Sequence, residues 1–140
     1  MRPSFGSRMR PSRPLAFGAL RRSDGAAVPH IGLPGNPASA LVALVKFARP
    51  ALARMMGRPP DGPRRIEAVM DERIVNFDGR RVYARVALEW RGGEHHARLT
   101  GAQGSNLLTS VAAADGLAIC HEDAPAVEAG ERTTVELLDW

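Results

Sequence analysis

The residues best suited to chemistry lie in Gly32–Ala40, a rigid run of glycine, proline and asparagine that leads into an apolar stretch. Pro34 fixes φ, and Gly35 can take a positive φ that other residues resist. Asn36 is a preferred helix N-cap, and Pro37 suits the first helical position because its missing N–H would be unpaired there anyway. The segment predicts a shaped turn at a helix N-terminus, a place where proteins hold anions.

The residues on either side predict the elements that position this turn. Residues 28–33 are short and mostly apolar, which indicates a strand. Apolar residues recur at helical spacing over 38–48 and predict a helix, which should weaken near Pro50 because proline removes a backbone donor. A further helical turn should follow Pro50, and Gly57 should end it. The unit is therefore a strand, a rigid turn and a helix.

Two interpretations of the turn are open from these residues. In the first, the amides after Asn36 face outward and the Ser39 hydroxyl joins them in holding an oxyanion. In the second, the turn is only the start of a well-capped helix, a far commoner feature than an anion site.

Four segments, taken together, resemble one family. They are 9–18, 32–52, 100–106 and 114–119, and they resemble the molybdopterin molybdenumtransferase family, which includes the C-terminal part of gephyrin, in the same order and with similar spacing. The resemblance covers roughly residues 9 to 140, and a glycine-rich segment of the family's third domain has no counterpart. It therefore implies a C-terminal portion of such a protein, incomplete and inactive on its own.

The resemblance also implies an activity. Members insert molybdenum into molybdopterin, with adenylylated molybdopterin and molybdate as substrates and magnesium as the cation that helps to cleave the adenylate. It implies a cytoplasmic protein that is a homodimer when complete, with metal ligands outside this chain. It places the substrate-binding residues at Pro34, Gly35, Asn36, Pro37 and Ser39.

Other positions carry over from the same family pattern. Arg10 and Arg13 stand where the family has lysines, and either can pair with phosphate or molybdate oxygens; a solvated basic tail is the alternative. Ser12 replaces a glycine and would strain its loop if that position needs a positive φ. A possible cleft lining, or equally a packing turn, is formed by Gln103, Gly104 and Ser105.

The predicted fold is α+β, with a strand–turn–helix remnant of an α/β domain before a small all-β domain. Residues 1–57 form the remnant, with a disordered start at least to Ser7, and the Pro- and Gly-rich run 58–64 reads as a linker. Residues 65–140 are expected to form a β-clip-like or barrel-like domain that folds separately from the helix. The alternation over 82–89 predicts a half-buried strand there, and 91–94 a hairpin turn.

Charge is divided unevenly along the 140 residues. Residues 1–65 hold 12 Lys and Arg against 2 acids, whereas residues 66–140 hold 7 Arg against 13 acids. The basic half would suit a small multiply charged anion or nucleic acid, but it carries no series of stacking aromatics and no named nucleic-acid motif. Two alternative functions are therefore a non-catalytic stand-alone binding or interaction module and, less favoured, a basic nucleic-acid-associated protein.

Other chemistry finds little support in the residue pattern. The single cysteine, Cys120, lies in an apolar run and is expected to be a buried, inert thiol; a lone cysteine agrees with a reducing cytoplasm. His95 and His96 would point to opposite faces of a strand, so they are not expected to share a metal. No residue is assigned as catalytic or as a metal ligand, and no apolar run reaches the about 18 residues of a membrane span.

Overall fold

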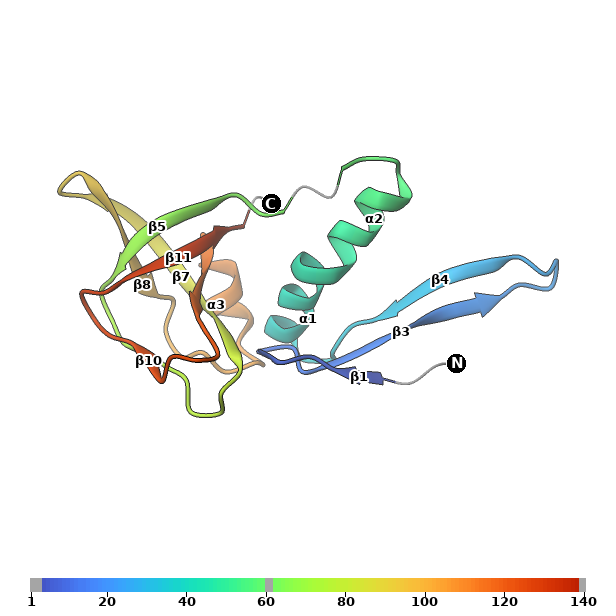
Figure 1. The fold of residues 1–140 in the computed structure, drawn as a ribbon, viewed down its shortest axis with the longest axis horizontal. Coiled ribbons are helices and arrows are strands. Elements are labelled where there is room, and N and C mark those ends of the chain that lie inside the picture. The colour runs from blue at the N-terminus through green and yellow to red at the C-terminus, as the bar shows by residue number, and fades with distance from the viewer. Residues whose placement is uncertain (1–3, 60–61, 139–140) are drawn as a thin grey trace.

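The computed structural model describes residues 4–59 and 62–138, and in it a small sheet, a helix and a barrel-like β-domain follow one another (Figure 1). The small sheet is antiparallel with the order β1-β3-β4. Its strands are β1 (Ser4–Gly6), β3 (Pro14–Arg21) and β4 (Ala27–Gly32). The expected disorder up to Ser7 is wrong for residues 4–6, because β1 pairs with the beginning of β3; residues 1–3 lie outside the described residues.

A single helical run follows the rigid turn. Its parts are α1 (Pro37–Ala43), the π-helical segment η1 (Leu44–Ala48) and α2 (Arg49–Met55). The expected weakening of the helix near Pro50 takes the form of this π segment, in which the N–H of Arg49 donates to the carbonyl of Leu44. Gly57 ends the helix as predicted, at φ 71°. The N–H groups of Gly57 and Arg58 bond back to the last helical turn in a Schellman-type cap.

The β-domain is a barrel-like sheet, which confirms the predicted fold class. Strand order is β2-β7-β8-β5-β11-β9, and an additional pairing of β7 with β9 closes the ring. The strands are β2 (Met9–Arg10), β5 (Arg65–Met70), β7 (Arg81–Arg91), β8 (Glu94–Leu99), β9 (Gly116–Cys120) and β11 (Arg132–Leu137). Shorter elements are β6 (Ile74–Val75), β10 (Ala126–Val127) and α3 (Leu108–Ala112). The β7–β8 hairpin turns at Gly92 and Gly93, both at positive φ, as the sequence predicts.

β2 belongs to the opening segment of the chain but lies on the barrel. Met9 and Arg10 pair in parallel with Arg81 and Val82 at the edge of β7. The basic opening segment is therefore attached to the β-domain, and its side chains are placed by a strand more than 70 residues further along the chain.

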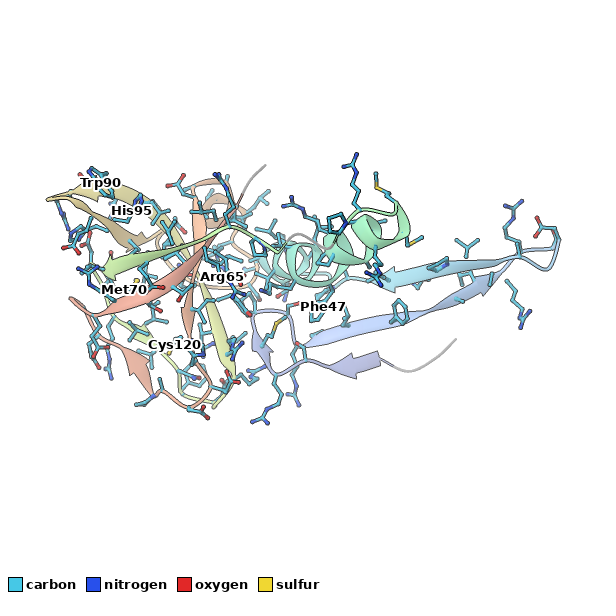
Figure 2. The ribbon with its side chains drawn as sticks, turned by 45° about the horizontal axis from the view of Figure 1, so that its top comes forward. Phe47, Arg65, Met70, Trp90, His95 and Cys120 are labelled. Carbon is cyan, nitrogen blue, oxygen red and sulfur yellow. The ribbon has the colours of Figure 1, made fainter. Side chains whose placement is uncertain are left out.

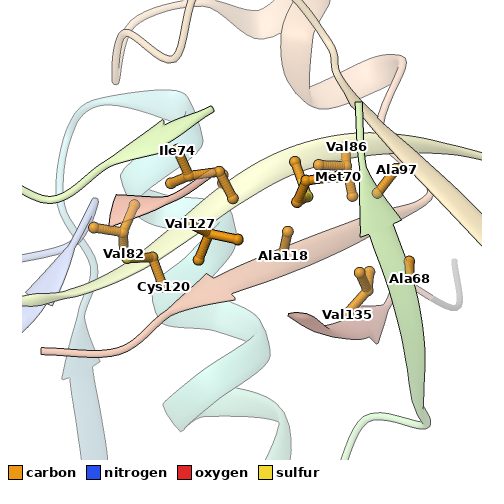
Figure 3. Packing of buried hydrophobic residues seen from close by; sticks show 11 residues of the cluster. Ala68, Met70, Ile74, Val82, Val86, Ala97, Ala118, Cys120, Val127 and Val135 are labelled. Atoms are coloured by element: carbon orange, nitrogen blue, oxygen red, sulfur yellow. The ribbon is translucent and has the colours of Figure 1, made fainter. Parts of the chain in front are cut away.

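Two hydrophobic clusters hold the molecule together. The first fills the barrel (Figure 3), and its buried members are Ala68, Met70, Ile74, Val82, Ala84, Val86, Ala97, Ala118, Cys120, Val127 and Val135. The second lies between helix and barrel, and its buried members are Ala38, Leu41, Val42, Val45, Tyr83, Val111, Ala114, Leu117, Ile119 and Leu138. Because α1 packs on the outer face of β7 and β9, that face is buried as well.

The half-buried strand predicted over 82–89 is therefore wrong at two positions. Tyr83 is 4% exposed and Arg85 is 0% exposed, although the alternation assigns both to the solvent face. Tyr83 packs against the helix cluster, and Arg85 is covered by α3, which the sequence analysis did not predict. Alternation of apolar and polar residues along a strand identifies its buried face only when the other face is open to water.

A buried ion pair also joins helix and barrel. Glu136 in β11 is 0% exposed, and both of its carboxylate oxygens accept from Lys46 Nζ, at 2.7 and 2.8 Å. Arg65 Nη2 adds a third bond at 2.9 Å. The division into 1–57, 58–64 and 65–140 stays a prediction, with residues 60–61 of the linker outside the described residues. The shared cluster and the ion pair do not favour independent folding of the two parts.

Candidate functional site

The rigid turn at 34–39 lies against the barrel. Asn36 has the extended N-cap conformation, φ −76° and ψ 130°, and Pro37 begins α1 as predicted. The Asn36 side chain makes no capping bond to the helix; its Nδ2 donates instead to Ser105 Oγ at 3.0 Å. The N–H of Ala38 donates to the carbonyl of Ser105 at 3.1 Å. The expectation that the amides after Asn36 face outward is therefore wrong for Ala38.

Gly35 and Ser39 add two details about the turn. Gly35 does not use a positive φ, and a Cβ added there would meet nothing within 4 Å, so its conformational freedom is not needed. Ser39 is 6% exposed, and its hydroxyl has no hydrogen-bond partner in the part of the chain that the structure describes. The turn is shaped by its prolines and by Ser105, and it leaves one nearly buried hydroxyl with unused bonding capacity.

The second turn, 101–106, is held by a buried arginine that sequence reasoning missed. Gln103 pairs through its side-chain amide with the backbone of Arg85, at 2.8 Å from the Arg85 N–H and 3.2 Å to its carbonyl. The guanidinium of Arg85 donates to Ser110 Oγ at 2.6 Å and to the Gly104 carbonyl at 3.0 Å. Burial lowers the pKa of Arg85, and its Nη1 has no partner among the described residues. The packing-turn interpretation of Gln103 is thus supported by its contacts.

A pocket of about 360 Å³ opens beside these turns. Arg10 and Gln103 line it together with mainly apolar side chains of the barrel. The Arg10 guanidinium lies 4.0 Å from the ring centroid of Phe77, and its Nη2 donates to the carbonyl of Val75. Phe77 carries no sequence signal, because a single aromatic residue in a polar loop has no periodicity to mark it.

The predicted site residues fall into two groups joined by one turn. Asn36 meets Ser105 at the start of α1, and Arg10 shares the pocket with Gln103. Gln103 and Ser105 belong to the same turn, so the two groups are neighbours. Arg13 is exposed and does not line the pocket, and none of Pro34, Gly35, Pro37, Ser39, Gly104 or Ser105 lines it either.

Ser12 lies between the two predicted arginines in a strained conformation. Its φ is 90°, in the left-handed region that favours glycine, so the expected strain at this position is confirmed. Ser12 is 3% exposed, and its Oγ has no hydrogen-bond partner among the described residues. The 10–13 loop therefore combines backbone strain with a buried, unsatisfied hydroxyl.

The remaining candidate groups have structural surroundings. Cys120 is buried in the barrel core as expected, and burial raises the pKa of its thiol. His95 packs edge-on against Trp90 at the end of the β7–β8 hairpin (Figure 2), while His96 contacts Asp71, so the two histidines make separate contacts. Within the described residues, no group of three or more His, Cys, Asp or Glu side chains could hold a metal ion.

No helix in the described part of the chain combines the length and the apolar character needed to cross a bilayer.

Comparison with known proteins agrees with this architecture. Residues 67–138 match the family described as the MoeA C-terminal region (domain IV). A molybdopterin molybdenumtransferase 2 of Mycobacterium tuberculosis is 35% identical over 128 residues, covering 91% of this chain and 30% of the relative. The molybdopterin molybdenumtransferase of Haemophilus influenzae is 26% identical over 133 residues, covering 91% of this chain and 31% of the relative.

A solved structure extends the likeness beyond the barrel. The molybdopterin biosynthesis moea protein from Pyrococcus horikosii superimposes with a TM-score of 0.74 at 27% identity, covering 97% of this chain and 32% of that one. The fold is thus a helix packed on a barrel domain, with a hairpin arm that extends away from the barrel (Figure 1). Barrel domains of this type form the MoeA C-terminal region. The chain belongs to the MoeA C-terminal region (domain IV) family. It spans about 30% of the length of the curated relatives that it matches.

Proposed function

We propose that this chain forms the C-terminal part of an active site that inserts molybdate into adenylylated molybdopterin, a step of molybdenum cofactor biosynthesis. Family membership and the names of the matched relatives, molybdopterin molybdenumtransferases, support this. The observation that carries the proposal is the contact between Ser105 and the 36–38 turn, which brings two family-like segments together 69 residues apart in sequence.

The residues present are suited to holding anions rather than to acid–base chemistry. Ser39 would donate its unused hydroxyl to an oxyanion, and Arg10 and Arg13 would supply positive charge. Pro34 and Pro37 would keep the turn in shape, Gly35 would leave room beside it, and Asn36 would fix it to the barrel. The 103–105 turn would form the wall between the two groups of residues.

Three finer parts of the proposal concern what lies beyond this chain. The described residues do not fit a magnesium site, so magnesium, as cation of the complete reaction, would be bound by ligands in the part of the relatives that this chain does not span. We also propose a homodimer for the complete protein and a cytoplasmic location, with which the single buried Cys120 agrees.

A chimaeric enzyme tests the function directly. Residues 9–138 of this chain would replace the matching C-terminal part of the Haemophilus influenzae relative, and AMP release from adenylylated molybdopterin would be followed in the presence of molybdate and magnesium. We expect a folded, active chimaera and no turnover by the 140-residue chain alone. A chimaera that folds and dimerises but releases no AMP would contradict the proposal.

One substitution in the chimaera tests the oxyanion contact. Ser39→Ala should weaken molybdate or substrate binding, because a hydrogen bond to a charged group is worth about 1.5–3 kcal/mol. Thr134→Ala is the control, since that hydroxyl donates to Glu67 on the barrel and belongs to neither turn. Calorimetric titration that shows unchanged binding in Ser39→Ala would favour the plain helix-start interpretation.

A further inference from the structure

The surroundings of Arg10 are unusual for a cationic side chain at a pocket. Its guanidinium lies over the ring of Phe77, 4.0 Å from the centroid, and donates to the carbonyl of Val75. Both partners are neutral, and both belong to the same stretch of the barrel, at the end of β6 and just after it. Arg10 itself comes from β2, in the opening segment of the chain. The contact therefore joins two parts of the sequence at the rim of one pocket.

Asp78 is an acid whose pKa is influenced by the charge of Arg10, but its carboxylate already pairs with Arg80. Asp78 follows Phe77, and its carboxylate accepts from Arg80 Nε at 2.8 Å. The hydrogen bond from Arg80 is the main cause of the lowered pKa of Asp78, and Arg10 makes the last of the contributions to it. Among the described residues, no carboxylate forms an ion pair with Arg10. Within the described part of the chain, its charge is thus not offset by a contacting acid.

The other arginine at the pocket shows the contrast. Arg73 also lines the pocket, but its Nε lies 2.9 Å from the Glu128 carboxylate. Of these two pocket arginines, Arg10 is the one whose charge is not offset by a contacting acid.

Phe77 is not a buried core residue. It is 77% exposed, so its ring contributes little to the hydrophobic core. A planar guanidinium stacked on a ring keeps the N–H groups in its own plane available for two-pronged contact with an oxyanion. The contact with Phe77 also restricts the Arg10 side chain before an anion binds. Less side-chain entropy is then lost on binding.

We propose that Phe77 is a positioning residue that holds the Arg10 guanidinium at the pocket, ready to bind an oxyanion of the substrate. This inference rests on the proposed function for the nature of the anion, which is either molybdate or the phosphate of the adenylate. The position of Arg10 can be tested without any ligand, so failure of this inference is distinguishable from failure of the proposed function.

The first measurement is nuclear magnetic resonance on the 140-residue chain without ligand. The Nε–Hε signal of Arg10, assigned from its loss in Arg10→Gln, should show a ring-current shift toward high field. The shift should disappear in Phe77→Ala and persist in Phe77→Tyr and in the control Leu108→Ala, which alters another exposed apolar residue, 64% exposed. An Arg10 signal that is the same in wild type and Phe77→Ala would overturn the proposal.

The second measurement is calorimetric titration of the chimaera and its variants with molybdate and, separately, with AMP. Phe77→Ala should weaken binding about two- to fivefold, the equivalent of about 0.5–1 kcal/mol for an exposed cation–π contact. Phe77→Tyr should restore it, and Leu108→Ala should leave it unchanged. An effect on one ligand alone identifies that oxyanion as the one that Arg10 binds. If Arg10→Gln weakens binding and Phe77→Ala does not, or if Arg10→Gln has no effect on either ligand, the inference is wrong even where the chimaera is active.

Discussion

Replacing Lys46 by methionine should strongly destabilise the protein, because it leaves a buried carboxylate with too few partners. Glu136 has a side chain only 1% exposed, and both of its oxygens accept from Lys46 Nζ at 2.7 and 2.8 Å. The lysine belongs to η1 and the glutamate to β11, so this pair connects the helix to the barrel. In Lys46→Met, the 2.9 Å bond from Arg65 would be the only side-chain bond to Glu136 left among the described residues.

The magnitude follows from the burial of the two partners. Removing one member of a buried ion pair costs about 3–5 kcal/mol. The bond that Arg65 still donates to Glu136 should keep the loss at about 3 kcal/mol. Arg65 has a side chain 62% exposed, so Arg65→Met should cost less than about 1 kcal/mol. Replacing both partners, in Lys46→Met/Glu136→Met, removes the charges together and should lie within about 1 kcal/mol of wild type.

The measurement is urea unfolding of wild type, Lys46→Met, Glu136→Met, the double variant and Arg65→Met, with stability taken from the midpoint and slope. The double-mutant cycle should give a coupling energy of at least about 2 kcal/mol between the two positions. The reasoning would be refuted if Lys46→Met costs no more than Arg65→Met, or if the two single losses simply add in the double variant. Either result would mean that the carboxylate is hydrated or neutral, and that the pair does not join helix to barrel.

Three further outcomes are expected. Ser12→Gly should raise stability by about 1 kcal/mol in thermal unfolding, because it relieves a φ of 90° and removes an unpartnered hydroxyl; a lower melting temperature would contradict this. Burial raises the pKa of Asp71, but the hydrogen bonds with His96 and Arg91 lower it by more, so this pKa lies below its ordinary 3.8. Its contribution to stability should be complete above about pH 4 and lost as pH falls through the lowered pKa, so Asp71→Asn should flatten that acid limb of the stability curve. Proteolysis within 58–64 should leave two fragments that elute together in gel filtration, and separation of the fragments would show that the helix does not hold to the barrel.

Local signals explain which elements could be predicted. The strand before the rigid turn, the start of the helix at Pro37 and its end at Gly57 are encoded by neighbouring residues, and the structure confirms all three. The hairpin at Gly92 and Gly93 is equally local. Proline and glycine act through their own backbone preferences, so their effect can be read without knowing the tertiary structure.

Elements that depend on distant partners could not be read in this way. β2 is only two residues long and exists because β7 offers it an edge. Arg85 is buried because α3 and the 101–106 turn cover it, and nothing in the alternation of β7 shows that cover. The same reason applies to the site, where the contact between Asn36 and Ser105 and the stacking of Arg10 on Phe77 join residues far apart in sequence.

The uneven charge of the two halves acquires a specific meaning from these contacts. Five acids of the second half pair with arginines of that half, as in the pairs of Asp71 with Arg91 and Glu122 with Arg81. Glu136 is an exception, since it pairs with Lys46 and Arg65 of the first half. Glu136 thus anchors the helix to the barrel, whereas among the described residues Arg10 contacts neutral groups at the pocket and forms no ion pair. Arg10 therefore keeps its positive charge beside the pocket, which is the charge that the proposed binding of an anionic substrate requires.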